Sequence, residues 1–178
     1  MDKNLFVSKL NNALPGVVLE SRPFGRSGIF SIWIEAQSIT QVAKELKQDS
    51  ELHMDWLENL SVVELEEVFV VTYLVRSSVT KNQIILRISA VPGNKAEKVR
   101  FPSVREIWPM AIPMEKEAEE LFGIHFRGKD QKSFEEVHFL PEGWEGFPLR
   151  KNYEFPKGYS GIVHSRTSQP FARKKSSS

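Results

Sequence analysis

Four glutamates lie close together in one short segment that is predicted to be helical: Glu115, Glu117, Glu119 and Glu120. Carboxylates perform acid–base chemistry or bind a metal ion only when several of them converge on one point. Residues four apart share a helix face, so Glu115 and Glu119 lie together while apolar residues occupy another face. This pattern favours a solvated face, with negative charge near the helix N-terminus, over a catalytic or metal site.

The other residues that could carry chemistry form no recognisable motif. The four histidines, His53, His125, His138 and His164, give no His-x-x-x-His pair, which is a common zinc-binding arrangement. The sequence contains none of the glycine-rich motifs that bind phosphates or dinucleotides, and no Gly-x-Ser-x-Gly. We therefore expect packed or surface histidines. One alternative stays open, a free-standing hydrolase that uses Glu115 and Glu119 with His125.

Composition excludes several classes of protein. The chain has 178 residues and no cysteine, so it cannot hold a Cys-ligated zinc ion or iron–sulfur cluster, nor use a thiol nucleophile. The net charge of +1 gives no general case for nucleic-acid binding. A further alternative, an RNA-binding module, would depend on basic residues near the C-terminus: Arg166, Arg173, Lys174 and Lys175. No aromatic stacking platform accompanies them.

The sequence was also searched for targeting peptides and membrane-spanning segments, and neither is predicted. The N-terminal residues read as neither a signal peptide nor a transit peptide. The longest apolar run, residues 68–75, is far shorter than the ~20 residues that a membrane-spanning helix needs. We expect any contact with a membrane to be made through a partner.

Hydrophobic periodicity predicts the elements that must position these residues. We expect helices over residues 5–14 and 38–47, the second capped by Ser38 with Gln41, and a hairpin over residues 17–35. Further strands are predicted at residues 65–77, 82–91 and 134–140. Helical segments are predicted from Pro102 and from Pro113, the latter ending at Gly123. The order indicates an α+β domain, with one mostly antiparallel sheet and helices on one face.

Residues 140–156, which we call the C-terminal ribbon, have the sequence LPEGWEGFPLRKNYEFP and follow no regular period. The ribbon combines three prolines and two glycines with four large aromatic rings. Such rings bury more readily against a second protein than within a small domain, and Trp, Tyr and Arg dominate interface energetics. From the residues alone, a loop over the domain's own core and a docking segment are equally acceptable interpretations.

One family resemblance favours the docking segment. The sequences FPSVREIWPMA, EKEAEELFGIHFRG and HFLPEGWEGFPLRKNY resemble the C subunit of NADH–quinone oxidoreductase, the 30-kilodalton subunit of respiratory complex I. The resemblance is close over residues 101–153. The ribbon is its most specific part, because the family reads Leu-Pro-Glu-Asp-Trp-x-Gly-His/Phe-Pro-Leu-Arg-Lys-Asp-Tyr there. The sequence GKDQKSFEEV, residues 128–137, departs from the family's Gly-His-Pro-x-Leu-Arg-Arg, so contacts normally made there are expected to be rebuilt or lost.

The resemblance implies a non-catalytic accessory subunit of the peripheral arm of a proton-translocating NADH:quinone oxidoreductase. Its cofactors, NADH, flavin, iron–sulfur clusters and quinone, would be bound by neighbouring subunits, with none on this chain. The subunit would lie on the cytoplasmic side of the inner membrane, or of an equivalent organellar membrane, and pack against the large quinone-site subunit. An equivalent subunit of a membrane-bound hydrogenase or a related complex is the nearest alternative.

We accordingly expect an α+β domain over residues 1–140 and an extended partner-binding tail over residues 141–178. The expected partner-binding residues all lie in the ribbon: Trp144, Gly146, Phe147, Pro148, Leu149, Arg150, Lys151 and Tyr153.

Overall fold

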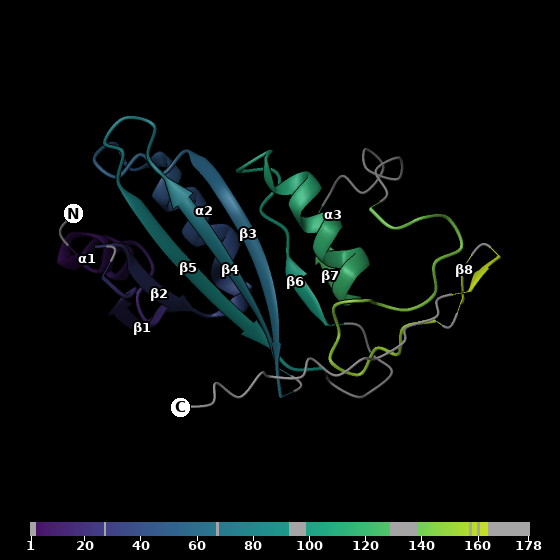
Figure 1. Ribbon diagram of the computed structural model, residues 1–178. Coiled ribbons are helices and arrows are strands. Elements are labelled where there is room, and N and C mark those ends of the chain that lie inside the picture. The colour runs from purple at the N-terminus through teal and green to yellow at the C-terminus, as the bar shows by residue number, and fades with distance from the viewer. Residues whose placement is uncertain are drawn as a thin grey trace, which may run out of the picture.

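The computed structural model is organised around a single large sheet (Figure 1). It describes residues 3–26, 28–66, 68–92, 99–128, 139–156, 158–159 and 161–163. Within these residues, no helix is both long enough and apolar enough to span a bilayer.

The main sheet has five strands in the order β1-β2-β5-β4-β3. Its two hairpins are β1 (Val18–Pro23) with β2 (Phe30–Ile34), and β3 (Trp56–Leu65) with β4 (Val68–Arg76). Strand β5 (Gln83–Ala90) joins them by pairing antiparallel with β4 and parallel with β2. The expected mostly antiparallel sheet is thus confirmed, with one parallel pairing at its centre.

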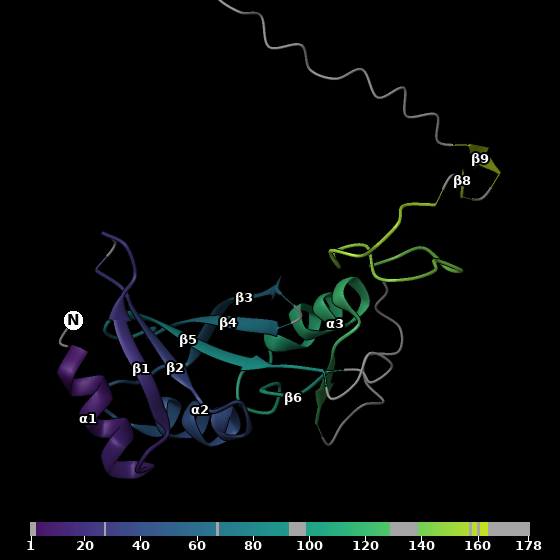
Figure 2. The ribbon, with the colours of Figure 1, turned by 90° about the horizontal axis from the view of Figure 1, so that it is seen from below.

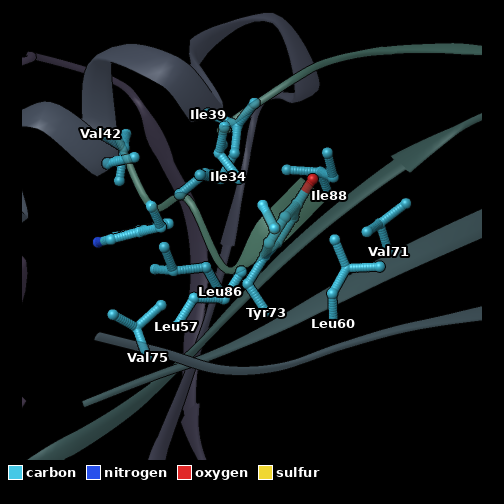
Figure 3. Close-up of a cluster of buried hydrophobic side chains, with 14 of the residues drawn as sticks. Ile34, Ile39, Val42, Leu57, Leu60, Val71, Tyr73, Val75, Leu86 and Ile88 are labelled. Atoms are coloured by element: carbon cyan, nitrogen blue, oxygen red, sulfur yellow. The ribbon is translucent and has the colours of Figure 1, made fainter. Parts of the chain in front are cut away.

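The hydrophobic core lies on one face of this sheet. Helix α2 (Ile39–Gln48), preceded by the short 3₁₀ helix η1 (Ala36–Ser38), lies on that face, and helix α1 (Lys3–Ala13) contacts α2 and β1 (Figure 2). Alternate strand residues point towards α2, as the period of two requires. Figure 3 shows this cluster, with these residues labelled: Ile34, Ile39, Val42, Leu57, Leu60, Val71, Tyr73, Val75, Leu86 and Ile88.

A second, smaller layer of structure lies beside β3 and contains a separate two-stranded sheet. The short strand β6 (Arg100–Pro102) pairs in parallel with β7 (His125–Arg127), and helix α3 (Ala111–Phe122) connects them and contacts β3. The expected end of this helix at Gly123 is confirmed, because Gly123 adopts the left-handed conformation with φ 66°. A two-strand pair, β8 (Gly158–Tyr159) and β9 (Ile162–Val163), follows the ribbon.

The structure corrects three local predictions. The helix expected from Pro102 is wrong, since Pro102 ends β6 and residues 104–108 form a single turn, closed by the Trp108 N–H donating to the Val104 carbonyl. The indole Nε1 of Trp108 donates to the carbonyl of Met54 at 3.0 Å, which ties this turn to the main domain. Ser38 precedes α2 as expected, but its side chain makes no capping bond with the described part of the helix.

The strand expected over residues 65–77 is also shifted, because Leu65 ends β3 and the turn of a hairpin separates it from β4. Residues 134–138 of the expected last strand lie outside the described residues, as do residues 164–178 and most of the GKDQKSFEEV segment. The described end of that strand, Phe139 and Leu140, is a bend. The α+β class with helices on one face holds, and the division at residue 140 stays a prediction.

Candidate functional site

The first candidate site is the row of glutamates on α3, and Glu115 is its most buried member. Its side chain is 1% exposed. The Ser103 hydroxyl donates to Oε2 at 2.6 Å and the Val104 backbone N–H donates to Oε1 at 2.9 Å. Arg105 Nε lies 3.4 Å from the same carboxylate. Burial raises the pKa of Glu115 to about 6, opposed by these hydrogen bonds and by the charge of Arg105.

Glu119 lies one helical turn further along and binds a different piece of backbone. Its Oε1 accepts a hydrogen bond of 2.7 Å from the N–H of Phe126 in β7 and lies 3.1 Å from Nδ1 of His125. Glu119 therefore fixes β7 against α3. His125, which the hydrolase alternative would use, contacts the same carboxylate.

Glu120 holds the start of the ribbon. Its Oε2 accepts hydrogen bonds from the backbone N–H groups of Phe139 at 2.7 Å and Leu140 at 3.0 Å, and Lys116 lies 3.5 Å from Oε1. A carboxylate that receives two consecutive N–H groups orders the chain there without any regular secondary structure.

The α3 carboxylates therefore point to separate backbone segments and do not converge. General acid–base catalysis needs carboxylates within reach of one substrate, and Glu115 is closed to solvent. Within the described parts of the chain, no three His, Asp or Glu side chains are grouped so that they could hold a metal ion. The arrangement supports a structural role for Glu115, Glu119 and Glu120.

The second candidate site is the ribbon, and its central part is anchored to the end of α3. Arg150 Nε donates to the carbonyl of Phe122 at 2.6 Å, and Nη2 donates to the carbonyl of Gly123 at 3.2 Å. These carbonyls lack partners within the helix, and a cation at a helix C-terminus is favourable. The guanidinium also lies 5.1 Å from the ring centroids of both Phe69 and Phe147, a cation–π distance to each ring.

Three further contacts fix the same part of the ribbon. Gly123 lies so close to Phe147 that a Cβ built on the glycine would be 2.4 Å from the ring. The Leu149 N–H donates to the Leu121 carbonyl at 3.1 Å, and the Lys151 N–H donates to the Glu64 carboxylate at 2.8 Å. Residues 147–151 are thus held by α3 and by the β3–β4 hairpin of their own chain.

The outer part of the ribbon is an aromatic cluster formed by Trp144, Tyr153 and Phe155. Their ring centroids are 6.0 to 6.5 Å apart, with Trp144 and Tyr153 stacked and Phe155 edge-on to both. Gly146 leaves room for this arrangement, since a Cβ there would lie 2.8 Å from the Tyr153 ring. The three rings contact one another, which gives this part of the ribbon a defined local shape.

The expected partner-binding residues therefore fall into two groups. Phe147, Leu149, Arg150 and Lys151 lie on the domain, whereas Trp144 and Tyr153 lie in the aromatic cluster. Leu149 is 52% and Phe155 is 46% exposed, so apolar surface remains uncovered in both groups. Pro148, between Phe147 and Leu149 in the chain, is half-buried. That these residues bind a partner stays a prediction.

Sequence reasoning missed the residues that receive the ribbon. Phe69 and Glu64 lie in strands far from the ribbon along the chain, and no local pattern pairs them with Arg150 or Lys151. Glu120 stood out only as one of several helix glutamates. The usable signal was Gly123, because a helix-ending glycine predicts free carbonyls that a nearby arginine can bind.

The sequence was compared with known protein families and with individual relatives. The family profile described as "Respiratory-chain NADH dehydrogenase, 30 Kd subunit" matches residues 32–159. Two relatives, each named as the C subunit of NADH-quinone oxidoreductase, come from Roseiflexus sp. (strain RS-1) and Roseiflexus castenholzii. Each is 34% identical over 155 residues, covering 85% of this chain and 84% of its own. The relative of the same name from Chloroherpeton thalassium is 31% identical over 124 residues, covering 68% of this chain and 48% of its own.

A solved structure shares the fold at much lower sequence identity. A chain of the membrane-bound sulfane sulfur reductase, described as an archaeal respiratory membrane complex, superposes with a TM-score of 0.61 at 16% identity. The superposition covers 76% of this chain and 75% of that one.

Proposed function

The chain belongs to the family of the respiratory-chain NADH dehydrogenase 30 kDa subunit, and from this membership we propose that it is a non-catalytic subunit that supports assembly of the enzyme's peripheral arm. The subunit would contribute surface and rigidity, while the reaction takes place on other chains. NADH, flavin, iron–sulfur clusters and quinone would be held by those neighbours.

The ribbon carries this proposal. Its residues 147–151 are held in place by Arg150 and Glu64, while Leu149 and Phe155 keep about half of their surface exposed. A preorganised segment loses little conformational entropy when it binds, so its exposed apolar surface is available to stabilise a complex. The large quinone-site subunit is the partner that we propose for it.

The hydrogen bonds of the α3 glutamates support a non-catalytic role for the chain. Glu115, Glu119 and Glu120 each bind backbone N–H groups of this same chain, so these three carboxylates are directed at backbone rather than at a reaction site. Such internal hydrogen bonds hold the ribbon and the β6–β7 layer in place, because these segments form few backbone hydrogen bonds of regular sheet.

We also propose a peripheral position on the cytoplasmic side of the membrane. The relatives' names place them in a quinone-reducing enzyme, and this chain would reach the membrane only through such partners. No nucleic-acid ligand is proposed. The family membership favours this function over the hydrolase and RNA-binding alternatives, and the names of the Roseiflexus relatives favour it over a hydrogenase subunit.

Co-purification tests the proposal. The full-length chain, tagged and expressed in its native host, should recover the other subunits of an NADH:quinone oxidoreductase, with the large quinone-site subunit in equal amount. Recovery of a large subunit that carries nickel-binding cysteines would instead indicate the hydrogenase alternative. A monomeric chain that recovers no respiratory subunit would contradict the proposal.

A further inference from the structure

The outer face of the main sheet, opposite α2, carries a second feature that the ribbon does not explain. Figure 1 looks onto this face, and no described helix lies in front of β5 and β4. Ile32 and Ile34 of β2 point into the core, so the alternating residues Ser31 and Trp33 point outwards. Arg87 of β5 is the register partner of Trp33 and shares that outer face.

Three polar atoms of these residues are buried without a hydrogen-bond partner among the described residues: Ser31 Oγ, Trp33 Nε1 and Arg87 Nε. Ser31 is 1% exposed. Buried polar groups in folded proteins nearly always have partners, so unpaired donors clustered on adjacent strands need an explanation. All three groups can donate, and the described part of the chain offers none of them an acceptor.

Arg87 is the charged centre of this group. Its guanidinium carbon lies 5.3 Å from the ring centroid of Phe24 and 5.7 Å from that of Trp33, so two rings hold the side chain in one orientation. No carboxylate of the described residues forms an ion pair with it. The nearby Glu20 lies instead 3.6 Å from the Nε of Arg22.

The surroundings are positive and partly apolar. Arg22 is the register partner of Ser31, and Arg26 follows in the turn of the same hairpin. Burial lowers the pKa of Arg87, and the charge of Arg22 lowers it further, so a negative charge beside the guanidinium would stabilise its charged form against both effects. Phe24 is 45% exposed beside the guanidinium.

We propose that Arg87, held between Phe24 and Trp33, binds a carboxylate side chain of a neighbouring subunit that docks on the outer face of the sheet. This inference rests on the proposed function, because it needs a neighbouring subunit. Charge complementarity selects the carboxylate, and the exposed Phe24 ring favours a protein surface over a free anion, which would gain nothing from apolar contact. Arginine and aromatic residues together are typical of the energetic centre of an interface.

The test measures assembly of the whole complex with the full-length chain. We expect Arg87→Glu to lower the recovery of partner subunits at least about tenfold, since it opposes the carboxylate with a like charge. Arg87→Met, which keeps the length of the side chain between the rings, should fold normally and also bind more weakly. Lys44→Glu makes the same charge change on the exposed side of α2 and should leave recovery unchanged.

A photo-crosslinking amino acid at Phe24 identifies the occupant. The crosslinked peptide should belong to another subunit and contain Asp or Glu. A crosslink to this chain, either within one copy or between two, would overturn the inference, as would equal recovery with Arg87→Met and wild type. If the wild-type chain recovers its complex while both Arg87 variants do so equally well, only this inference fails. If wild type recovers nothing, the proposed function fails with it.

Discussion

Arg150 and Phe122 are joined by a hydrogen bond of 2.6 Å, from the guanidinium Nε of the ribbon to the last carbonyl of α3. The bond connects the only long helix of the β6–β7 layer, within the described residues, to a segment without regular structure. It gives Arg150 a role within its own chain. Any contact of this residue with a partner would therefore be made by a side chain that is already fixed.

Arg150→Ala is expected to destabilise the isolated chain by about 1–3 kcal/mol, the usual range for hydrogen bonds to a charged group. The substitution removes the bonds to Phe122 and Gly123 and the packing between Phe69 and Phe147. Urea unfolding of the purified chain measures the loss. Lys151→Ala is the matched control. It removes a neighbouring exposed cation but keeps the hydrogen bond to Glu64, which is donated by the backbone N–H of residue 151. Equal stability of the two variants would contradict the anchoring role of Arg150.

Gly123→Ala is expected to displace the ribbon from α3. The left-handed conformation costs a residue with a Cβ about 1–2 kcal/mol, and here the Cβ would also collide with the Phe147 ring. Gly143→Ala is the control, because its φ is 79° but no atom of the described residues lies within 4 Å of the new Cβ.

A double mutant separates the collision from the backbone strain. In a chain that already carries Phe147→Ala, the substitution at Gly123 should cost only as much as the one at Gly143. Unfolding free energies of the four variants give the comparison. If Gly123→Ala lowers the unfolding free energy equally with and without Phe147→Ala, the close contact with the ring does not contribute to the loss of stability.

Glu115 is expected to make the chain less stable at neutral pH than in mild acid. Its folded-state pKa of about 6 lies above the ordinary value of 4.5, so the folded protein binds this proton more tightly than the unfolded chain. Protonation of Glu115 therefore makes its full contribution to the unfolding free energy below pH 4.5, and this contribution is lost as the pH rises through 6. The difference corresponds to about 2 kcal/mol.

Comparison with Glu115→Gln isolates this effect, since all other titrating groups are common to both chains. The unfolding free energy of wild type minus that of the variant should fall by about 2 kcal/mol between about pH 4.5 and 7.5. Urea unfolding across this range measures it. A difference that does not change with pH would show that Glu115 titrates normally in the folded chain.

Trp144→Ala and Leu149→Ala are expected to weaken assembly with the partner subunit by about 2 kcal/mol or more if these residues lie at the centre of the interface. Leu149 is 52% exposed, so its truncation should hardly change the stability of the isolated chain. Leu19→Ala is the matched control, because Leu19 is a 67% exposed leucine on β1. Affinity measured with the complex lacking this subunit tests the prediction. Wild-type affinity in both ribbon variants would exclude the ribbon from the interface.

Most of the fold was predictable because its elements follow local rules. Alternation in β2, β4 and β5 and the apolar stripe of α2 are set by which residues must face the core. The missing helix at Pro102 shows the limit of this reasoning. Val104, Ile107 and Trp108 have helical spacing, but all three are buried in a single turn, and Trp108 binds the distant Met54 carbonyl.

The candidate sites divide in the same way. The ribbon was recognisable from its composition, and Gly123 from the helix it ends. The receiving residues Phe69 and Glu64 were not, because about 80 residues separate them from Arg150 and Lys151 in the chain and no local pattern links them.

Residue patterns alone were enough to predict the α+β class, strands β1, β2, β4 and β5, the end of α3 and the family that the chain resembles. These properties depend on periodicity, turn residues and motifs that act over a few positions. The tertiary structure was needed to show that Glu115 and Glu119 accept backbone hydrogen bonds, and that Arg87 lies near both Phe24 and Trp33 with no carboxylate partner among the described residues. The physical reason is that hydrogen bonds, burial and ion pairing depend on distances between residues far apart in the chain, which folding alone sets.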